Sequence, residues 1–141
     1  MLKNLELLKP EEFTQPMQFL GGRSPRDVLA HTMEAEIFWM QCALQGRPEP
    51  QFDQFEQYSD VETVRKKWEL TAAETKEYLR GLTPEALMAE KTVDWGGGNV
   101  SHFPLWLAIY HVITHEFHHK GQIVFAAHHL GYSPPETDLS W

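Results

Sequence analysis

Two histidines in the last third of the chain are spaced so that one metal ion could join them. His115 and His119 are four positions apart, and on a helix this spacing places both imidazoles on one face, one turn apart. Seven of the eight histidines lie within residues 102–129. Because neutral imidazole is a frequent ligand of divalent transition metals, this clustering indicates metal or proton chemistry.

A pair of imidazoles leaves a metal site incomplete, and His31 is the candidate for the third ligand. It is the one histidine outside the cluster, and it falls in an apolar stripe at helical spacing. The stripe consists of Val28, His31, Ala35, Phe38 and Cys42. If this stripe faces the last helix, His31, His115 and His119 converge. Three imidazoles with open coordination positions are typical of catalytic metal sites; zinc or nickel would suit them, with cobalt or iron as alternatives.

Other assignments of these residues stay open. His111 lies on the same helical ladder and could replace His119 as the partner of His115. Glu34 follows His31 by three positions, so it could act as a carboxylate ligand, a general base or a partner of a ligand. The simplest alternative is a helix face whose histidines only pack or bind water.

The segment from His115 to His119 also has the spelling H-E-x-x-H, in which a glutamate serves as the base of zinc proteases. Here that residue would be Glu116. The chain is short for a protease and shows no strand edge to hold a peptide substrate. We therefore do not expect proteolysis.

The composition excludes several classes of function. The 141 residues are expected to form a single domain, residues 1–141. A net charge of -8 opposes binding to nucleic acid. No apolar run approaches the roughly 20 residues of a membrane helix, and the acid near the start argues against a secretory signal. The single cysteine, Cys42, allows no intrachain disulfide. We expect a cytoplasmic protein with a small-molecule substrate and no membrane partner.

Capping residues and hydrophobic periodicity predict an all-α helical bundle. Pro10 and Pro16 break the first 20 residues, so any first helix should be short. A tail from residue 133 onward should be irregular, and an extended piece is expected over residues 91–95. The predicted helices cover residues 24–44, 61–80 and 102–130, with a short turn of helix after Thr83.

Three tryptophans lie on predicted helix faces and one lies in a predicted loop. Trp39, Trp68 and Trp106 are at positions expected to pack in the core. Trp95 stands beside a run of three glycines and could form the wall of a pocket.

Two stretches of the sequence resemble the signatures of the DinB-like, damage-inducible-type proteins. Residues 22–31, followed by acids and Trp39, resemble the second helix of that family. Residues 107–123, which contain His115-x-x-His118-His119-Lys120-Gly121-Gln122, resemble its last helix, although the family usually has arginine where this chain has Lys120. The resemblance covers about residues 5–132.

The resemblance implies a four-helix bundle, often dimeric, with a divalent metal on three histidines. Carried over by position, these are His31, His115 and His119. The chain departs from the family in its short or truncated first helix, which would leave an apolar groove and favours a homodimer.

The family includes proteins that resemble thiol S-transferases using bacillithiol, mycothiol or glutathione, and others that resemble metal-dependent isomerases or hydrolases. We therefore expect a metal-dependent thiol S-transferase that acts on small electrophiles with a low-molecular-weight thiol as cosubstrate and Glu34 as the catalytic base. No organic cofactor site is expected. The alternatives are a non-catalytic metal-binding or stress-response module, or a metal-dependent hydrolase.

Overall fold

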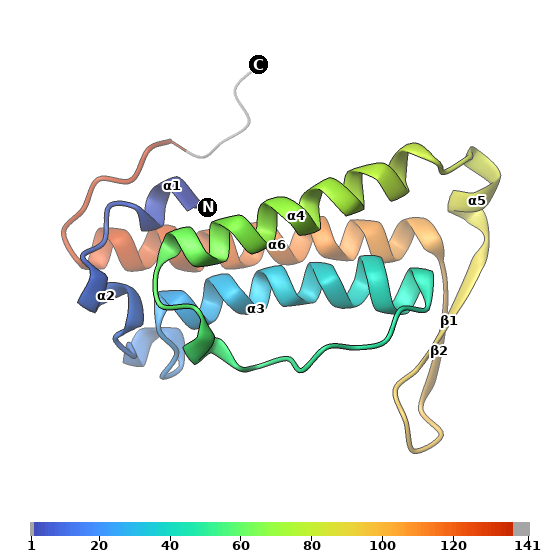
Figure 1. Cartoon of the computed structure of the whole chain (residues 1–141), viewed down its shortest axis with the longest axis horizontal. Helices are drawn as coiled ribbons and strands as arrows, with labels where there is room; N and C mark the ends of the chain where they lie inside the picture. The colour runs from blue at the N-terminus through green and yellow to red at the C-terminus, as the bar shows by residue number, and fades with distance from the viewer. Residues whose placement is uncertain (1, 137–141) are drawn as a thin grey trace.

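Three long helices lie side by side and form the body of the molecule (Figure 1). The computed structural model describes residues 2–136. Helix α3 (Pro25–Ile37) packs against both α4 (Val61–Arg80) and α6 (Leu105–His129). The indole N–H of Trp68 on α4 donates to the carboxylate of Glu36 on α3 at 2.7 Å. The all-α architecture expected from the sequence is confirmed.

Helix α3 begins as the capping pattern predicts. The Ser24 hydroxyl accepts from the Asp27 N–H at 3.2 Å, and the Asp27 carboxylate accepts from the Ser24 N–H at 2.9 Å. At its other end α3 continues into η2, a π-helical segment at Phe38–Ala43 in which the Leu44 N–H donates to the carbonyl five residues back. Such wide turns are rare and occur often at functional sites.

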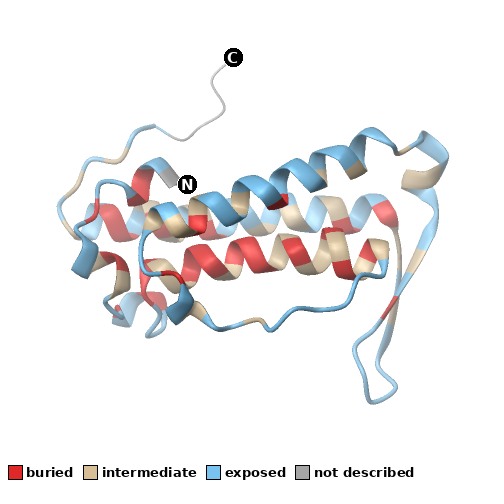
Figure 2. Cartoon of the chain, viewed as in Figure 1, coloured by how far each residue is buried: buried red, intermediate tan, exposed pale blue. Residues whose placement is uncertain are grey.

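Short helices occupy the place of a full first helix. They are α1 (Leu2–Leu5), α2 (Pro10–Thr14) and a 3₁₀ turn, η1 (Gln18–Leu20). Leu5 and Phe13 are buried, so these pieces close one end of the bundle (Figures 1 and 2). The expected short first helix is confirmed, because no helix in residues 2–20 extends beyond five residues.

A long connection joins η2 to α4. We call residues 46–58 the strap; it runs alongside α3 and contains one 3₁₀ turn, η3 (Phe55–Gln57). Helix α4 then begins after Asp60, whose side chain accepts from the Thr63 N–H at 2.8 Å.

A β-hairpin precedes the last helix. Helix α5 (Pro84–Met88) leads into β1 (Glu90–Asp94), which pairs antiparallel with β2 (Val100–Pro104). The extended piece expected at residues 91–95 is therefore present. Between the strands, glycines 96–98 all have positive φ, which only glycine adopts without strain.

The expected start of the last helix was wrong. His102 lies in β2 opposite Thr92, and α6 begins at Leu105. Pro104 is the physical reason, because a proline biases the residue before it toward extended backbone and fits well just before a helix. The sequence beyond α6 has no regular structure over residues 132–136; the expectation for residues 137–141 falls outside the described residues.

The core divides into two clusters. A large one lies toward the α1–α2 end and includes Leu29, Met33 and Ile123; a smaller one lies toward the hairpin and centres on Met40 and Leu105. Across residues 2–136, no helix is long and apolar enough to cross a membrane.

One face of α6 is apolar and exposed. We call it the outer face of α6; it contains Trp106, Tyr110, Ile113 and Phe117. Trp106 is 42 % exposed, so its expected place in the core was wrong: helical spacing marks a face, and no other described helix covers this one.

Candidate metal centre

Three histidines from two helices converge in the bundle. His31 comes from α3, and His115 and His119 come from α6. Each offers a ring nitrogen, and these atoms all lie within 4.8 Å of one another. The ring of His31 lies 5.1 Å from each of the other two rings, measured between centroids. The structure therefore brings together the three residues singled out from the sequence.

The separation of the nitrogens suits a shared cation. The Nε2 atoms of His115 and His119 are 3.1 Å apart. Imidazole nitrogens lie about 2.0–2.1 Å from zinc, so two such ligands in a tetrahedral shell stand about 3.3 Å apart. The two side chains would need to move by only a few tenths of an ångström to hold one ion.

Gln122 fixes the orientation of His119. The Oε1 atom of Gln122 lies 2.7 Å from Nδ1 of His119, and an amide oxygen only accepts hydrogen bonds. Nδ1 therefore carries the proton, which leaves the lone pair of a neutral His119 on Nε2, the atom that faces His115. A hydrogen bond of this kind typically orients metal-binding histidines and raises their basicity.

The environment keeps the histidines neutral. Burial, followed by the neighbouring His119 and His31, lowers the pKa of His115 to about 4. Burial also lowers the pKa of His31 and of His119. All three rings therefore present lone pairs near neutral pH, as metal ligation requires.

Glu34 lies beside the cluster but outside it. Its side chain is 6 % exposed and lines the same pocket as His31 and His115. Burial raises the pKa of its carboxyl group. The three-histidine cluster found among the described residues does not include Glu34, so the geometry favours a role as base or supporting residue over that of a ligand.

The strap holds Glu34 in place through a residue of unusual backbone conformation. The backbone N–H of Asp53 donates to Oε2 of Glu34 at 3.0 Å. Asp53 has a φ of 62°, in the left-handed region that non-glycine residues rarely adopt. Such strain costs about 1–3 kcal/mol and tends to persist at functional sites, where surrounding contacts over-determine it.

A pocket opens beside the histidines, with a volume of about 290 Å³. His31, Glu34 and His115 contribute polar groups to its lining. Aromatic side chains supply much of the remaining wall: Phe38, Trp39, Phe52 and Trp95. The expectation that Trp95 forms a pocket wall is confirmed.

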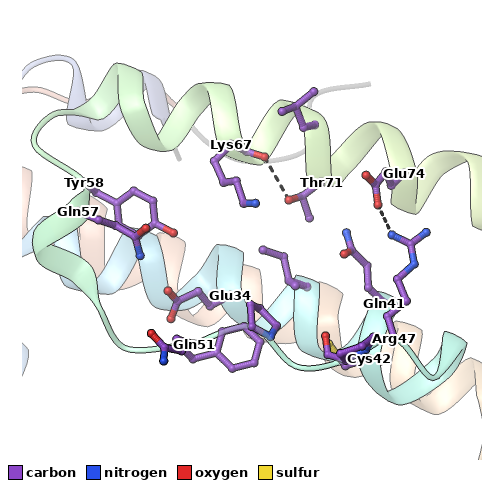
Figure 3. Close-up of a pocket in the computed structure, with 15 residues that line it drawn as sticks. Glu34, Gln41, Cys42, Arg47, Gln51, Gln57, Tyr58, Lys67, Thr71 and Glu74 are labelled. Atoms are coloured by element: carbon purple, nitrogen blue, oxygen red, sulfur yellow. Dashed lines mark hydrogen bonds and ion pairs between the residues drawn. The ribbon is translucent and has the colours of Figure 1, made fainter.

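A second cavity, of about 520 Å³, lies on the other side of Glu34, between α3, α4 and the strap (Figure 3). Cys42 lines it, donates weakly to the Pro48 carbonyl at 3.7 Å and has a pKa raised by burial. A protonated, hydrogen-bonded thiol is a poor nucleophile. Cys42 thus behaves as the buried small residue that the stripe on α3 suggests.

The remaining candidates lie outside the cluster. His111 is exposed and packs against Trp39, with ring centroids 5.0 Å apart. Glu116 lines a groove between α4 and α6 that none of the three clustered histidines lines. This arrangement does not place Glu116 beside the cluster as the base of a zinc protease.

Sequence reasoning missed two parts of the site. Gln122 enters the sequence analysis only as the end of a family motif, although its three-residue offset from His119 was a usable signal. Asp53 carried no usable signal, since only the tertiary contact between the strap and α3 brings its backbone to Glu34.

The fold and the cluster together define a class of protein: a helical bundle with three convergent histidines at its centre. Comparison with known families identifies the family within this class. The model of the DinB family matches residues 1–141, so the chain belongs to the DinB family.

A solved structure agrees with this assignment at the level of the fold. The chain is similar to the crystal structure of a DinB-like protein from Bacillus cereus ATCC 10987, with a TM-score of 0.73 and 17% sequence identity. The match covers 97% of this chain and 87% of that one. A search of curated proteins finds no match.

Proposed function

We propose that His31, His115 and His119 bind one divalent metal ion, with zinc or nickel as the best candidates. The convergence of their three ring nitrogens within 4.8 Å is the observation that carries this proposal. Their lowered pKa values and the hydrogen bond from His119 to Gln122 support it. Membership of the DinB family supports it as well, because metal binding is a property of that family.

The reaction we propose is transfer of a low-molecular-weight thiol to a small electrophile. A divalent ion at the three histidines would lower the pKa of a bound thiol or water and so supply a nucleophile at neutral pH. The thiol loses its proton, a new carbon–sulfur bond forms at the electrophile, and the bond to the leaving group breaks with its electron pair. Glu34 accepts the proton in this scheme, since its raised pKa makes it a better base than an ordinary carboxylate.

Metal analysis of protein purified without an immobilised-metal column tests the first part. We expect about one equivalent of zinc or nickel in the wild-type chain and none in His115→Ala/His119→Ala. His118→Ala is the matched control, because His118 is exposed and lies on the same helix. Absence of metal in the wild type, even after dialysis against zinc, would overturn the proposal.

Activity separates the transferase from its alternatives. A screen of thiols against small electrophiles should show turnover that depends on the metal and falls in Glu34→Gln, which keeps the size of the side chain. A stoichiometric metal with no thiol turnover would favour a non-catalytic binding module. Turnover of esters or amides without a thiol would favour a hydrolase.

We also propose that a second copy of the chain covers the outer face of α6, giving a homodimer. Trp106, Tyr110, Ile113 and Phe117 are spaced four, three and four residues apart and are exposed. This is the spacing of a helix that packs along a partner helix. A contiguous apolar stripe of this kind is characteristic of an interaction surface.

The remaining assignments follow from composition. The net charge of -8 disfavours a nucleic-acid partner, and the single cysteine is compatible with a reducing compartment. We therefore propose a cytoplasmic enzyme with a small-molecule substrate.

A further inference from the structure

The pocket beside the three histidines is large enough for an aromatic ring system. Its volume of about 290 Å³ is roughly twice that of a cavity that holds benzene. His31 and His115 form part of its lining. A ligand in this pocket would therefore lie next to the proposed metal.

The aromatic walls come from three separate segments of the chain. Phe38 and Trp39 belong to η2, Phe52 belongs to the strap, and Trp95 follows β1. Trp95 stacks on Phe38, with centroids 5.8 Å apart and planes at 28°. Phe38 meets Phe52 edge-on, with centroids 6.4 Å apart. These spacings are those of favourable aromatic pairs, so the wall is formed before any ligand arrives.

Two residues of this wall lie where α3 passes into η2. Phe38 and Trp39 are consecutive residues, and both line the pocket. The Phe38 N–H still donates to the carbonyls of Ala35 and Glu34, so the rings stand at the end of regular α3, and the wide turn follows them.

Trp95 is a large aromatic residue at a partly exposed position. It is 44 % exposed, on a hairpin that lies outside the helical core. Its indole N–H donates to the Ser101 hydroxyl at 2.9 Å, which fixes the orientation of the ring. A large aromatic side chain held in this way, beside a pocket and partly open to solvent, is suited to contact a ligand.

We propose that the substrate carries an aryl group that packs against Trp95, Phe38 and Phe52. Its reacting end then points toward His31 and His115. This assignment rests on the proposed function, because a divalent ion at the histidines makes the pocket a reaction site. Charge narrows the substrate further, since a bound divalent ion would repel a cation, and an anion would meet the side chains of Glu34 and Asp53, which also line the pocket. An uncharged aryl compound fits both the walls and the metal.

Titration calorimetry with 1-naphthol tests the proposal, on both the zinc-loaded and the metal-free full-length chain. Cyclohexanol serves as the non-aromatic probe. We expect one equivalent of 1-naphthol to bind in both forms, and cyclohexanol to bind at least tenfold more weakly. Trp95→Ala should weaken binding of 1-naphthol about tenfold, because it removes one wall. Trp106→Ala, which removes an exposed tryptophan of the outer face of α6, should leave binding unchanged.

Three results would overturn the inference: no binding of 1-naphthol at millimolar concentration, equal binding by Trp95→Ala, or loss of binding in Trp106→Ala instead. Titration of the metal-free chain tests binding by the aromatic walls alone, and metal analysis tests metal binding by the histidines alone. A failure of this inference can therefore be told apart from a failure of the proposed function. Circular dichroism checks that each variant is folded.

Discussion

The inner and outer faces of helix α6 each hold residues of the kind usually found on the opposite face. The inner face carries His115 and His119 into the bundle, where His119 is buried. The outer face carries Trp106, Ile113 and Phe117 into solvent. Both arrangements cost free energy in an isolated chain, since buried imidazoles lose hydration and exposed rings order water.

The two faces are stabilised in different ways. The inner face has its polar groups aligned on one another and on Gln122, so a single cation could satisfy them. The outer face is mostly apolar, with the Lys120 ammonium over the Phe117 ring, and its stabilisation would come from burial against another apolar surface. A polar group that is buried in a precise geometry indicates a ligand, whereas an apolar group left exposed indicates a partner.

Metal removal should have the largest effect. A ligand that binds only the folded chain adds about 4 kcal/mol at a concentration 1,000 times its Kd, which corresponds to roughly 12 °C in Tm for a chain of this length. We expect zinc to raise Tm by about this amount in the wild type and by much less in His115→Ala, measured by calorimetry. An equal response of His115→Ala would contradict the assignment of the inner face.

Introducing a charge on the outer face should break the proposed dimer. Phe117→Glu places a carboxylate at a residue that is 49 % exposed in the single chain. We expect dimer affinity to fall at least about 100-fold, since the change removes an apolar ring and buries a carboxylate at the interface, which costs several kcal/mol. Sedimentation velocity measures the change. Metal content should be unaltered, and Glu69→Gln on exposed α4 is a control that should remain dimeric.

Removing the partner of His119 should have an intermediate effect. Gln122→Ala deletes the acceptor that holds Nδ1 of His119. Loss of such supporting residues typically weakens metal binding 10-fold to 100-fold, and competition with a chromophoric chelator would measure it. Gln122→Glu keeps an acceptor and should restore most of the affinity; failure of this rescue would argue that Gln122 only packs.

Acid should also destabilise the metal-free chain. The pKa of His115 is about 4 in the folded chain and near 6.5 when unperturbed, so the unfolded state takes up a proton that the folded state excludes. Stability is therefore fully present above about pH 6.5 and is lost as the pH falls toward 4. Each excluded proton contributes up to about 1.4 kcal/mol per pH unit.

Denaturant unfolding between pH 4 and 7 measures this slope. The pKa values of His31 and His119 shift in the same direction and add to it. His115→Asn, which cannot titrate, should flatten the dependence. A slope that is unchanged in this variant would show that other groups control the acid response.

The three histidines of the cluster could be predicted from the sequence because residues able to bind a metal also have the spacing of a helix face. His31 lies in an apolar stripe, and His115 and His119 lie one turn apart on another helix, so helical geometry predicts their convergence if the stripe faces the last helix. The family resemblance predicts the same trio. The capping pattern at Ser24 likewise predicted where α3 begins, whereas α4 is capped by Asp60 and not by Ser59, with which the second capping pattern begins.

The rest could not be predicted because it depends on contacts between distant segments. Asp53 bonds to Glu34 across 19 positions, and no local pattern encodes that approach. Trp106 has the spacing of a core residue, but whether another helix covers it depends on the length of the first helix and on a second chain. Periodicity identifies the faces of a helix without saying which one is covered.

The placement of Phe52 and Trp95 on the strap and the hairpin bears on how such proteins can diverge. Segments of this kind tolerate substitution better than packed helices do, and only Val93 of β1 is buried. The residues proposed to contact a substrate could therefore vary while His115 and His119 remain on α6. A lineage built on this scaffold could acquire new substrates by a few replacements at the rim and keep the same chemistry at the centre.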